Sequence, residues 1–430
     1  MIISKEAYDR ERRLSPILAE GTRRGIRVDR KALLKDMDVL QEALNEAAQS
    51  VRNRLNNPTL NLASPLQLGQ ALAASDVLSK PLPLTAKGKP STGKEGLKEC
   101  IADKDLLDEL LYTSSLDTCI GTFIQPWLIF STADGRVHPE WNQVRDTDRG
   151  GRGTRTGRLS SSKPNFQNVP TEFRQDIPDG YPALPFMRRY CLPEEGHLWV
   201  KRDFSSQEIR ILAHFEDGTL QEAYCANPNM DPHELVRQII NRITAVLYDR
   251  KDVKITGFSI IYGSGINGIA NQLHKTYGEA SNIKSAFLRA LPGVRTLSRD
   301  VQAQGRMGDP IRTWGGRYYY AEASKIVKGR KMDFYYKLLN YLIQGSAADQ
   351  TKQVLGDWEF CFKKPTDLYL ATVHDEVNLS VPENDVVGGM VRLKDAMEQD
   401  LFDVPMRSEG FVGENWHDIR GWNDEDCKPD

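Results

Sequence analysis

The chain has 430 residues, 27% charged and 40% hydrophobic, a globular composition that excludes disordered and collagen-like proteins. At roughly 150 residues per domain, this length predicts two or three domains. It carries 57 Lys and Arg against 59 Asp and Glu, a net charge of −2, which on its face argues against a nucleic-acid-binding protein. No apolar run approaches the ~18 residues of a membrane helix, and the start lacks a secretory signal. Six widely spaced cysteines indicate reduced thiols, so we expect a cytoplasmic protein without a membrane segment.

The charge is unevenly distributed along the chain. Residues 383–430 carry a net charge of −8, so residues 1–382 carry +6. Within that larger part, residues 145–163 carry +4 and residues 295–331 carry +6. The second basic segment is interleaved with Trp314, Tyr318, Tyr319 and Tyr320. Such a mixture suits a phosphate backbone with stacked bases, although a solvated surface is the simpler explanation.

The first 130 residues are expected to form an α-helical module. Apolar residues recur at steps of three and four over residues 31–57, which predicts a long amphipathic helix in a helix–helix contact or a short coiled coil. Residues 64–94 are rich in Ser, Pro, Gly and Lys, and we expect an exposed connection there. A helical, apolar pattern returns over residues 106–130.

The middle of the chain mixes strands and helices. A β-rich run at residues 198–200 leads into Asp203, and a helical segment follows it. Asp231, Pro232 and Glu234 together form a helix-start signal for residues 231–245. The expected buried face of that helix consists of Leu235, Val236, Ile239, Ile240 and Ile243.

Two aspartates stand where strands are expected to end. The β-rich runs 368–373 and 377–381 predict a hairpin with His374, Asp375 and Glu376 at its turn. If Asp203 and Asp375 lie on one sheet, their carboxylates can converge on Mg²⁺, which takes few protein ligands and leaves room for phosphates. The simpler explanation is that each is a turn or cap residue.

A periodic stripe follows in the sequence. Arg250, Lys254, Phe258 and Tyr262 recur every four residues and so lie on one helix face, and Gly263 comes next. Two cations followed by two aromatic rings suit a nucleoside triphosphate, with the cations on the phosphates. An amphipathic helix with ordinary core aromatics would have the same spacing.

Three segments together resemble a known family, the DNA polymerase I-like or family A DNA polymerases. They match its motifs A, B and C in order, as Asp203-Phe204-Ser205-Ser206-Gln207-Glu208-Ile209-Arg210, Arg250-xxx-Lys254-xxx-Phe258-xxx-Tyr262-Gly263 and His374-Asp375-Glu376. Segments 15–100, 156–170, 340–349 and 413–416 also resemble parts of these enzymes, so the likeness covers almost the whole chain.

The resemblance implies an α+β fold shaped like a right hand, with an antiparallel palm sheet and a helical thumb and fingers. The expected divisions are a helical thumb region (1–130), the first part of the palm with motif A (131–214), the fingers with motif B (215–332) and the second part of the palm with motif C (333–430).

The implied activity is template-directed, primer-dependent DNA synthesis by two-metal-ion catalysis. Asp203 and Asp375, with the Phe204 carbonyl, are expected to hold two Mg²⁺ ions, with Mn²⁺ as a substitute. Lys254 is the expected general acid. The nucleotide-binding residues implied are Arg250, Lys254, Phe258, Tyr262, His233 and Glu208, with Glu208 as a gate against ribose.

The implied partners are primer–template DNA and dNTPs. The residues expected to contact DNA are Arg158, Asn165, Gln167, Asn168, Arg210, Asn340, Gln344 and His374, while Glu376 and Gly263 support the site. We expect a monomer in a bacterial or phage-infected cell, with a separate exonuclease or processivity factor as a further partner.

The sequence also departs from the family pattern. Nothing in residues 1–150 resembles an exonuclease domain, so no 3′→5′ proofreading is expected from this chain. Tyr336 stands where relatives have an Arg, residues 112–117 lack the usual basic thumb residues, and residues 145–152 form an Arg/Asp/Gly-rich insertion. Weaker duplex binding is therefore expected.

Two other functions remain as alternatives. Single-subunit phage-type RNA polymerases share the palm and fingers, but they typically lack the counterparts of Glu208 and Glu376. A non-catalytic DNA-binding protein on a decayed polymerase fold is a different class, and the intact Asp203, Asp375 and Lys254 argue against it.

Overall fold

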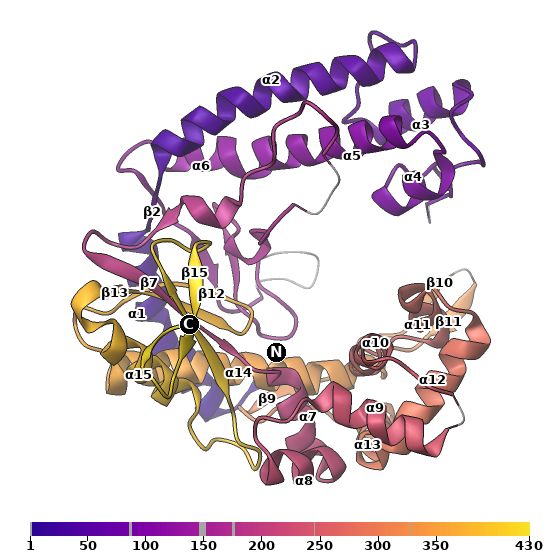
Figure 1. Ribbon diagram of the computed structural model, residues 1–430. Coiled ribbons are helices and arrows are strands. Elements are labelled where there is room, and N and C mark those ends of the chain that lie inside the picture. Colours follow the sequence, from indigo (N-terminus) through magenta and orange to yellow (C-terminus); the bar gives the residue numbers. More distant parts are fainter. Residues whose placement is uncertain (1, 86–87, 146–151, 174–176, 245, 328) are drawn as a thin grey trace.

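A computed structural model describes residues 2–85, 88–145, 152–173, 177–244, 246–327 and 329–430. Across these residues the centre is an antiparallel sheet of six strands in the order β12-β13-β7-β14-β15-β16 (Figure 1). The strands are β7 (His197–Phe204), β12 (Leu368–Val373), β13 (Glu376–Pro382), β14 (Ser408–Gly413), β15 (Ile419–Asn423) and β16 (Lys428–Pro429). The helices nearest the sheet are α1 (Lys5–Arg24), α7 (Gln207–Glu216), α14 (Lys337–Asp357) and α15 (Val386–Met397).

A group of helices stands above the sheet in Figure 1. It comprises α2 (Arg30–Arg54), α3 (Pro65–Ala74), α4 (Lys94–Cys100), α5 (Lys104–Thr118), a π-helical turn (Cys119–Ile124) and α6 (Gln125–Phe130). The long helix predicted over 31–57 is confirmed, and the Asp29 side chain caps it by accepting from the Ala32 N–H at 3.0 Å. The exposed connection predicted over 64–94 is only partly right, because a helix occupies Pro65–Ala74. Ser64 caps this helix and Pro65 occupies its first turn, where no N–H is needed.

A second helical group lies beside the sheet, drawn in rose and orange in Figure 1. It comprises α8 (Thr219–Ala226), α9 (Pro232–Ile243), α10 (Arg250–Ile261), α11 (Ile266–Leu273), α12 (Tyr277–Ala290) and α13 (Pro292–Met307), with the hairpin β10 (Lys325–Val327) and β11 (Arg330–Met332). The predicted start of α9 is confirmed, because the Asp231 carboxylate accepts from the His233 and Glu234 N–H groups at 2.9 and 3.2 Å.

The buried face predicted for α9 is only partly right. Val236 and Ile240 are buried, and Leu235 and Ile239 pack against the same core. Ile243, however, is 46% exposed. The helix ends at this residue, and its side chain borders a surface hollow instead of the core.

Three small sheets tie distant segments together. They are β1 (Ile2–Ile3), β9 (Arg317–Tyr319) and β8 (Ile311–Arg312); β3 (Arg136–Val137), β2 (Ile26–Val28) and β6 (Cys191–Leu192); and β4 (Glu140–Asn142) with β5 (Ser160–Ser162). Their contacts correct part of the interpretation of residues 295–331. Tyr319 is buried, and the Trp314 indole donates to the Leu401 carbonyl at 3.0 Å. Base stacking is therefore wrong for Tyr319, and it stays a prediction for Tyr320, which is 50% exposed.

A stack of four aromatic rings lies beneath one face of the central sheet. Trp127, Phe166, Trp416 and Trp199 follow one another at centroid distances of 5.6, 5.7 and 5.7 Å, with interplanar angles of 3°, 13° and 16°. The rings come from α6, the 3₁₀ turn Phe166–Asn168, the chain after β14, and β7. The stack therefore fixes three separate segments against the strand that carries Asp203.

Two further expectations concern the whole chain. None of the helices in the described part of the structure combines the length and apolar content needed to cross a membrane. All six cysteines are free thiols, three of them buried.

Candidate active site

The central sheet brings the two predicted aspartates to one end. Asp203 lies on β7 directly opposite Glu376 of β13, and Asp375 occupies the turn that leads into β13. The Phe204 N–H donates to the Asp375 carbonyl at 3.4 Å, so the turn is held against the end of β7. The predicted three-residue turn is shorter by one, because Glu376 already belongs to the strand.

The two carboxylates occupy a partly buried, negatively charged position. Burial, followed by the charges of Asp375 and Glu376, raises the pKa of Asp203 to about 7. Burial also raises the pKa of Asp375. Such a pair is costly to ionise without a cation, and Mg²⁺ suits one or two carboxylates plus substrate phosphates. The described residues include no group of three or more His, Cys, Asp or Glu side chains that could hold a metal.

The Glu376 carboxylate is bound by neighbouring side chains of the protein. It accepts from the Trp416 indole and the Asn378 amide, each at 2.8 Å, and from Lys201 Nζ at 2.9 Å. Burial alone would raise the pKa of Glu376, but Lys201 and Arg188 hold it below its usual value. With its oxygens engaged in this way, Glu376 supports the hairpin and the aromatic stack.

Gln167 holds the hairpin that carries Asp375. Its Nε2 donates to the Thr372 carbonyl at 2.5 Å, and its Oε1 accepts from the His374 N–H at 3.2 Å. His374 itself has a left-handed φ of 59°, which turns the chain sharply before Asp375. Asn165 accepts from the Gln167 N–H at 3.1 Å, so these predicted DNA-contact residues also shape the turn.

The predicted stripe on α10 faces outward. Arg250, Lys254 and Tyr262 are exposed, whereas Val253, Ile260 and Ile261 of the same helix are buried. Phe258 is partly buried, with the Tyr262 ring 6.0 Å from its own. Tyr262 is therefore not a core aromatic, whereas Phe258 also packs against the core.

His233 of α9 lies beside the stripe, next to Phe258. Its ring lies 5.7 Å from that of Phe258. Burial, then the charge of Lys254, lowers the pKa of His233 to about 4, so the imidazole is neutral at neutral pH. Arg250 is held nearby, its Nε donating to Asp231 at 2.5 Å.

Glu208 joins the stripe to α7, the helix that follows β7. It lies in the first turn of α7, five residues after Asp203 of β7. Its Oε2 accepts from the Tyr262 hydroxyl at 3.0 Å. Its other oxygen pairs with the Arg158 guanidinium. Burial raises the pKa of Glu208 despite that arginine, and the Gln344 amide also hydrogen-bonds it. Four predicted site residues from four segments therefore meet at one point.

Gly263 closes the stripe against α14. Its φ is 73°, and an added Cβ would lie 2.5 Å from Tyr336 Cδ2. Tyr336 caps α14, and Asn340 and Gln344 follow on that helix at one-turn intervals. Asn168 and His374 are exposed near the hairpin turn, where the DNA contacts were predicted.

Arg210 departs from its predicted role. It is 3% exposed, and its guanidinium donates to the carbonyls of Ser205, Pro405 and Pro228 at 2.7–2.8 Å. It also lies over the Tyr224 ring, 4.3 Å from the centroid. The prediction that Arg210 contacts DNA is therefore wrong, because its side chain is buried and its hydrogen bonds hold the loops around α7.

Sequence reasoning missed the charged neighbours of the aspartates. Lys201 precedes Asp203 by two residues, so strand alternation alone could have placed it on the same face. Glu409 of β14 lies directly opposite Asp203, on the other side from Glu376. No sequence signal reveals this partner, because the pairing register of β14 depends on the assembled sheet.

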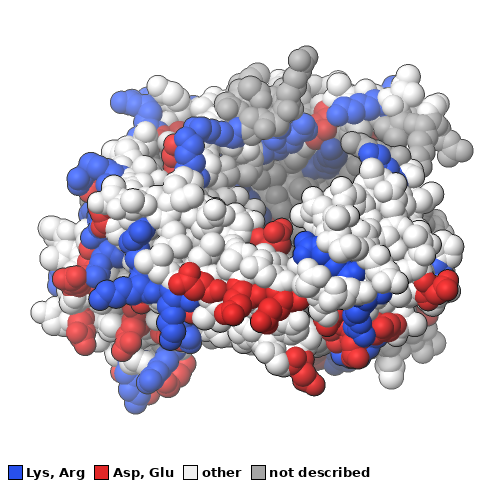
Figure 2. Space-filling model, turned by 90° about the horizontal axis from the view of Figure 1, so that it is seen from above, with Lys and Arg blue, Asp and Glu red and all other residues white. Residues whose placement is uncertain are grey.

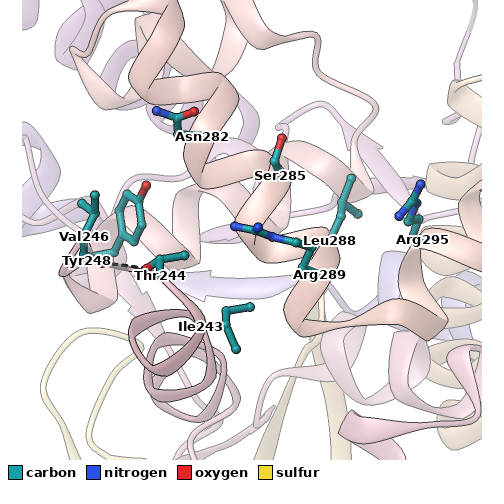
Figure 3. A pocket seen from close by; sticks show the side chains of 9 residues that line it. All are labelled: Ile243, Thr244, Val246, Tyr248, Asn282, Ser285, Leu288, Arg289 and Arg295. Atoms are coloured by element: carbon teal, nitrogen blue, oxygen red, sulfur yellow. Dashed lines mark hydrogen bonds between the residues drawn. The ribbon is translucent and has the colours of Figure 1, made fainter.

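Basic and acidic side chains are interspersed over the face of the molecule seen from above. Figure 2 shows this mixture, with a hollow near the middle of the view. A separate hollow of about 750 Å³ opens between the end of α9, α12 and α13, where Arg289 reaches toward Thr244 and Tyr248 (Figure 3). It shares no lining residue with the predicted site. The insertion predicted at 145–152 falls largely on residues 146–151, outside the described part of the chain.

Several known proteins are similar to this chain in sequence, and one solved structure is similar to it in fold. DNA polymerase DpoZ of Salmonella phage PMBT28 is 28% identical over 96% of this chain and 69% of its own length. The thermostable DNA polymerase I of Thermus filiformis is 29% identical over 94% of this chain and 47% of its own. This chain thus spans about half the length of the bacterial polymerases that it matches. The solved POL domain of Pol1 from M. smegmatis, in complex with DNA primer-template and dNTP, superposes with a TM-score of 0.79 at 27% identity, covering 95% of this chain and 70% of that one. The sequence profile of DNA polymerase family A matches residues 30–418, and the chain belongs to that family.

Proposed function

We propose that this chain is a DNA-directed DNA polymerase that extends a primer 3′ end on a template with dNTPs and releases pyrophosphate. The Tyr262–Glu208 hydrogen bond of 3.0 Å carries this proposal. It joins the cationic and aromatic stripe of α10 to the helix that follows Asp203. A nucleotide held along the stripe would therefore present its reacting phosphate to the paired aspartates.

Asp203 and Asp375 would hold the metal of the reaction. Members of family A use divalent metal ions, and we propose two Mg²⁺ ions here, with the Phe204 carbonyl as a further ligand and Mn²⁺ as a substitute. Bound ions would neutralise phosphate charge and acidify the primer hydroxyl. The donor set fits, because two partly buried carboxylates with raised pKa values gain most from a nearby cation.

The residues around the aspartates would orient the nucleotide. Arg250 and Lys254 would bind the phosphates, and Lys254 would donate the proton that pyrophosphate takes on leaving. The neutral His233 would donate a hydrogen bond to the same phosphates. Glu208, fixed by Tyr262 and Arg158, would fill the space of a ribose 2′-hydroxyl and so favour deoxynucleotides.

The DNA would lie along the β12–β13 hairpin and the start of α14. We propose contacts from Arg158, Asn165, Asn168, Asn340, Gln344 and His374, with Gln167 contributing chiefly by holding the turn. We also propose a thumb, a palm and fingers, with the two helical groups described above as thumb and fingers, and we change the predicted division in one place. Because α1 packs on α14 and β12, we assign residues 5–24 to the palm. A monomer, a cytoplasmic setting and a separate processivity factor remain proposals.

Primer extension tests this function. Asp375→Asn should lower single-encounter extension with dNTPs by about a thousand-fold or more, because one of the two metal-binding carboxylates is neutralised. Asp426→Asn changes an exposed acid at the far edge of the sheet and should extend as the wild type does. Retained activity in Asp375→Asn would refute the proposed site. Equal extension with NTPs and dNTPs would favour an RNA polymerase.

A further inference from the structure

A large hollow opens beside Tyr262 and Gly263, at the end of the stripe on α10. It has a volume of about 1110 Å³, which exceeds the roughly 300–1,000 Å³ of most small-ligand pockets. Tyr262 and Gly263 line one side, and Tyr336 and Asn340 of α14 line another. The hollow therefore begins where motif B ends and has room for more than one nucleotide.

The lining of this hollow is cationic. Arg155, Lys284, Lys325 and Lys337 face a single carboxylate, Glu322. Arg155 and Lys337 pair with Glu322 at 2.5 and 3.0 Å, whereas Lys284 Nζ donates only to the Ser264 carbonyl, at 3.1 Å. Lys325 makes no ion pair within the described ranges. Basic residues beside aromatic rings are the features that bind single-stranded nucleic acid.

The hairpin of β10 and β11 forms part of the wall of this hollow. Lys325 pairs with Met332, and both residues line the hollow. Ile326 pairs with Lys331, and strand alternation puts these two on the opposite face. Ile326 is 80% exposed and the Lys331 side chain 71% exposed, with its nearest carboxylate, Asp333, at 3.7 Å. The hairpin thus has one basic face toward the hollow and one apolar and basic face toward the outside.

We propose that this hairpin separates the strands of duplex DNA ahead of the primer. The inference rests on the proposed polymerase function. The template strand would pass along Lys325 and Met332 into the hollow. The displaced strand would lie against the outer face, with Ile326 packed on the last base pair and Lys331 on a phosphate. Exposed apolar side chains unstack base pairs in this way in other DNA-binding proteins.

The two faces can be tested with two substrates. One has a single-stranded gap ahead of the primer, and in the other a downstream strand fills that gap and must be displaced. The double variant Ile326→Ser/Lys331→Ser should slow synthesis through the duplex by about five-fold or more, and gap filling by less than about two-fold. Met307→Ser removes another apolar side chain, 78% exposed at the end of α13, and should change neither rate.

The remaining outcomes contradict the inference in different ways. A double variant that displaces the strand as fast as the wild type would overturn it, as would equal slowing on both substrates. A wild-type chain that fills the gap but stops at the downstream strand would also overturn it, while leaving the polymerase function intact. Extension of neither substrate would instead overturn the proposed function itself.

Discussion

At the scale of single residues, Gly263 occupies a position in the proposed site that does not accommodate a larger side chain. Its φ of 73° disfavours every residue with a Cβ, and the Tyr336 ring and carbonyl lie 2.5 and 2.9 Å from where a Cβ would stand. We expect Gly263→Ala to lower the free energy of unfolding by about 2 kcal/mol or more, from backbone strain plus the clash. Because Tyr336 and Tyr262 would shift, primer extension should fall as well.

Gly265 provides a matched control for this prediction. Its φ is −70°, and no atom lies within 4 Å of where its Cβ would stand, so Gly265→Ala should change stability by less than about 1 kcal/mol. Denaturant unfolding of both variants measures the difference. Equal stability of the two would show that Tyr336 moves aside without cost.

Residue types in the site were predictable, but their partners were not. The spacing of Arg250, Lys254, Phe258 and Tyr262 predicts an exposed helix face because helical geometry is local. The contacts of Gln167 with Thr372 and His374 join segments about 200 residues apart, which no local pattern encodes. Arg210 shows the same limit, since its carbonyl partners come from loops whose positions depend on the whole fold.

At the scale of elements, a buried ionic cluster joins α1, β9 and α14. It contains three cations, Arg10, Arg317 and Lys352, and two carboxylates, Glu11 and Asp349. Asp349→Ala would leave all three cations facing the single carboxylate of Glu11 and should cost about 3–5 kcal/mol of stability. Lys352→Met leaves two balanced pairs, so it should cost less than about 2 kcal/mol. Urea unfolding of both variants tests this ranking.

The same cluster predicts a pH dependence. Burial, then the charge of Arg317, lowers the pKa of Lys352 from its ordinary 10.5 to about 8. Between these values the unfolded chain binds more protons than the folded one, so the contribution of Lys352 to the free energy of unfolding rises with pH. The stability of the wild type relative to Lys352→Met should therefore increase from about pH 8 to about pH 10. A constant or falling difference would contradict the assignment.

Elements were predictable where the signal was local. The start of α9 follows from Asp231 and Pro232, and the helix over 31–57 follows from its apolar spacing. The helix at Pro65–Ala74 was missed because its composition is dominated by the flanking loops, although Ser64 and Pro65 are ordinary start signals. The exposure of Ile243 and the burial of Tyr319 depend on which elements cover them, and that is a tertiary property.

At the scale of the whole molecule, the near-zero net charge hides a separation of signs. Residues 383–430, with a net charge of −8, supply β14–β16 and α15, whereas the cations of the proposed DNA path lie on earlier segments. An excess of only +6 over residues 1–382 should give modest DNA affinity. We expect the affinity to fall with salt, by at most about a thousand-fold between 50 and 200 mM.

The slope of this salt dependence counts the phosphate contacts. If Lys325 binds a template phosphate, Lys325→Ser should lower the slope of log K against log salt by about one on a substrate with a template overhang. Lys428→Ser removes an exposed cation within the acidic C-terminal segment and should leave the slope unchanged. Fluorescence anisotropy with labelled primer–template measures both slopes. An unchanged slope for Lys325→Ser would place the template strand outside the hollow, because a cation that contacts a phosphate always releases a counterion from the DNA.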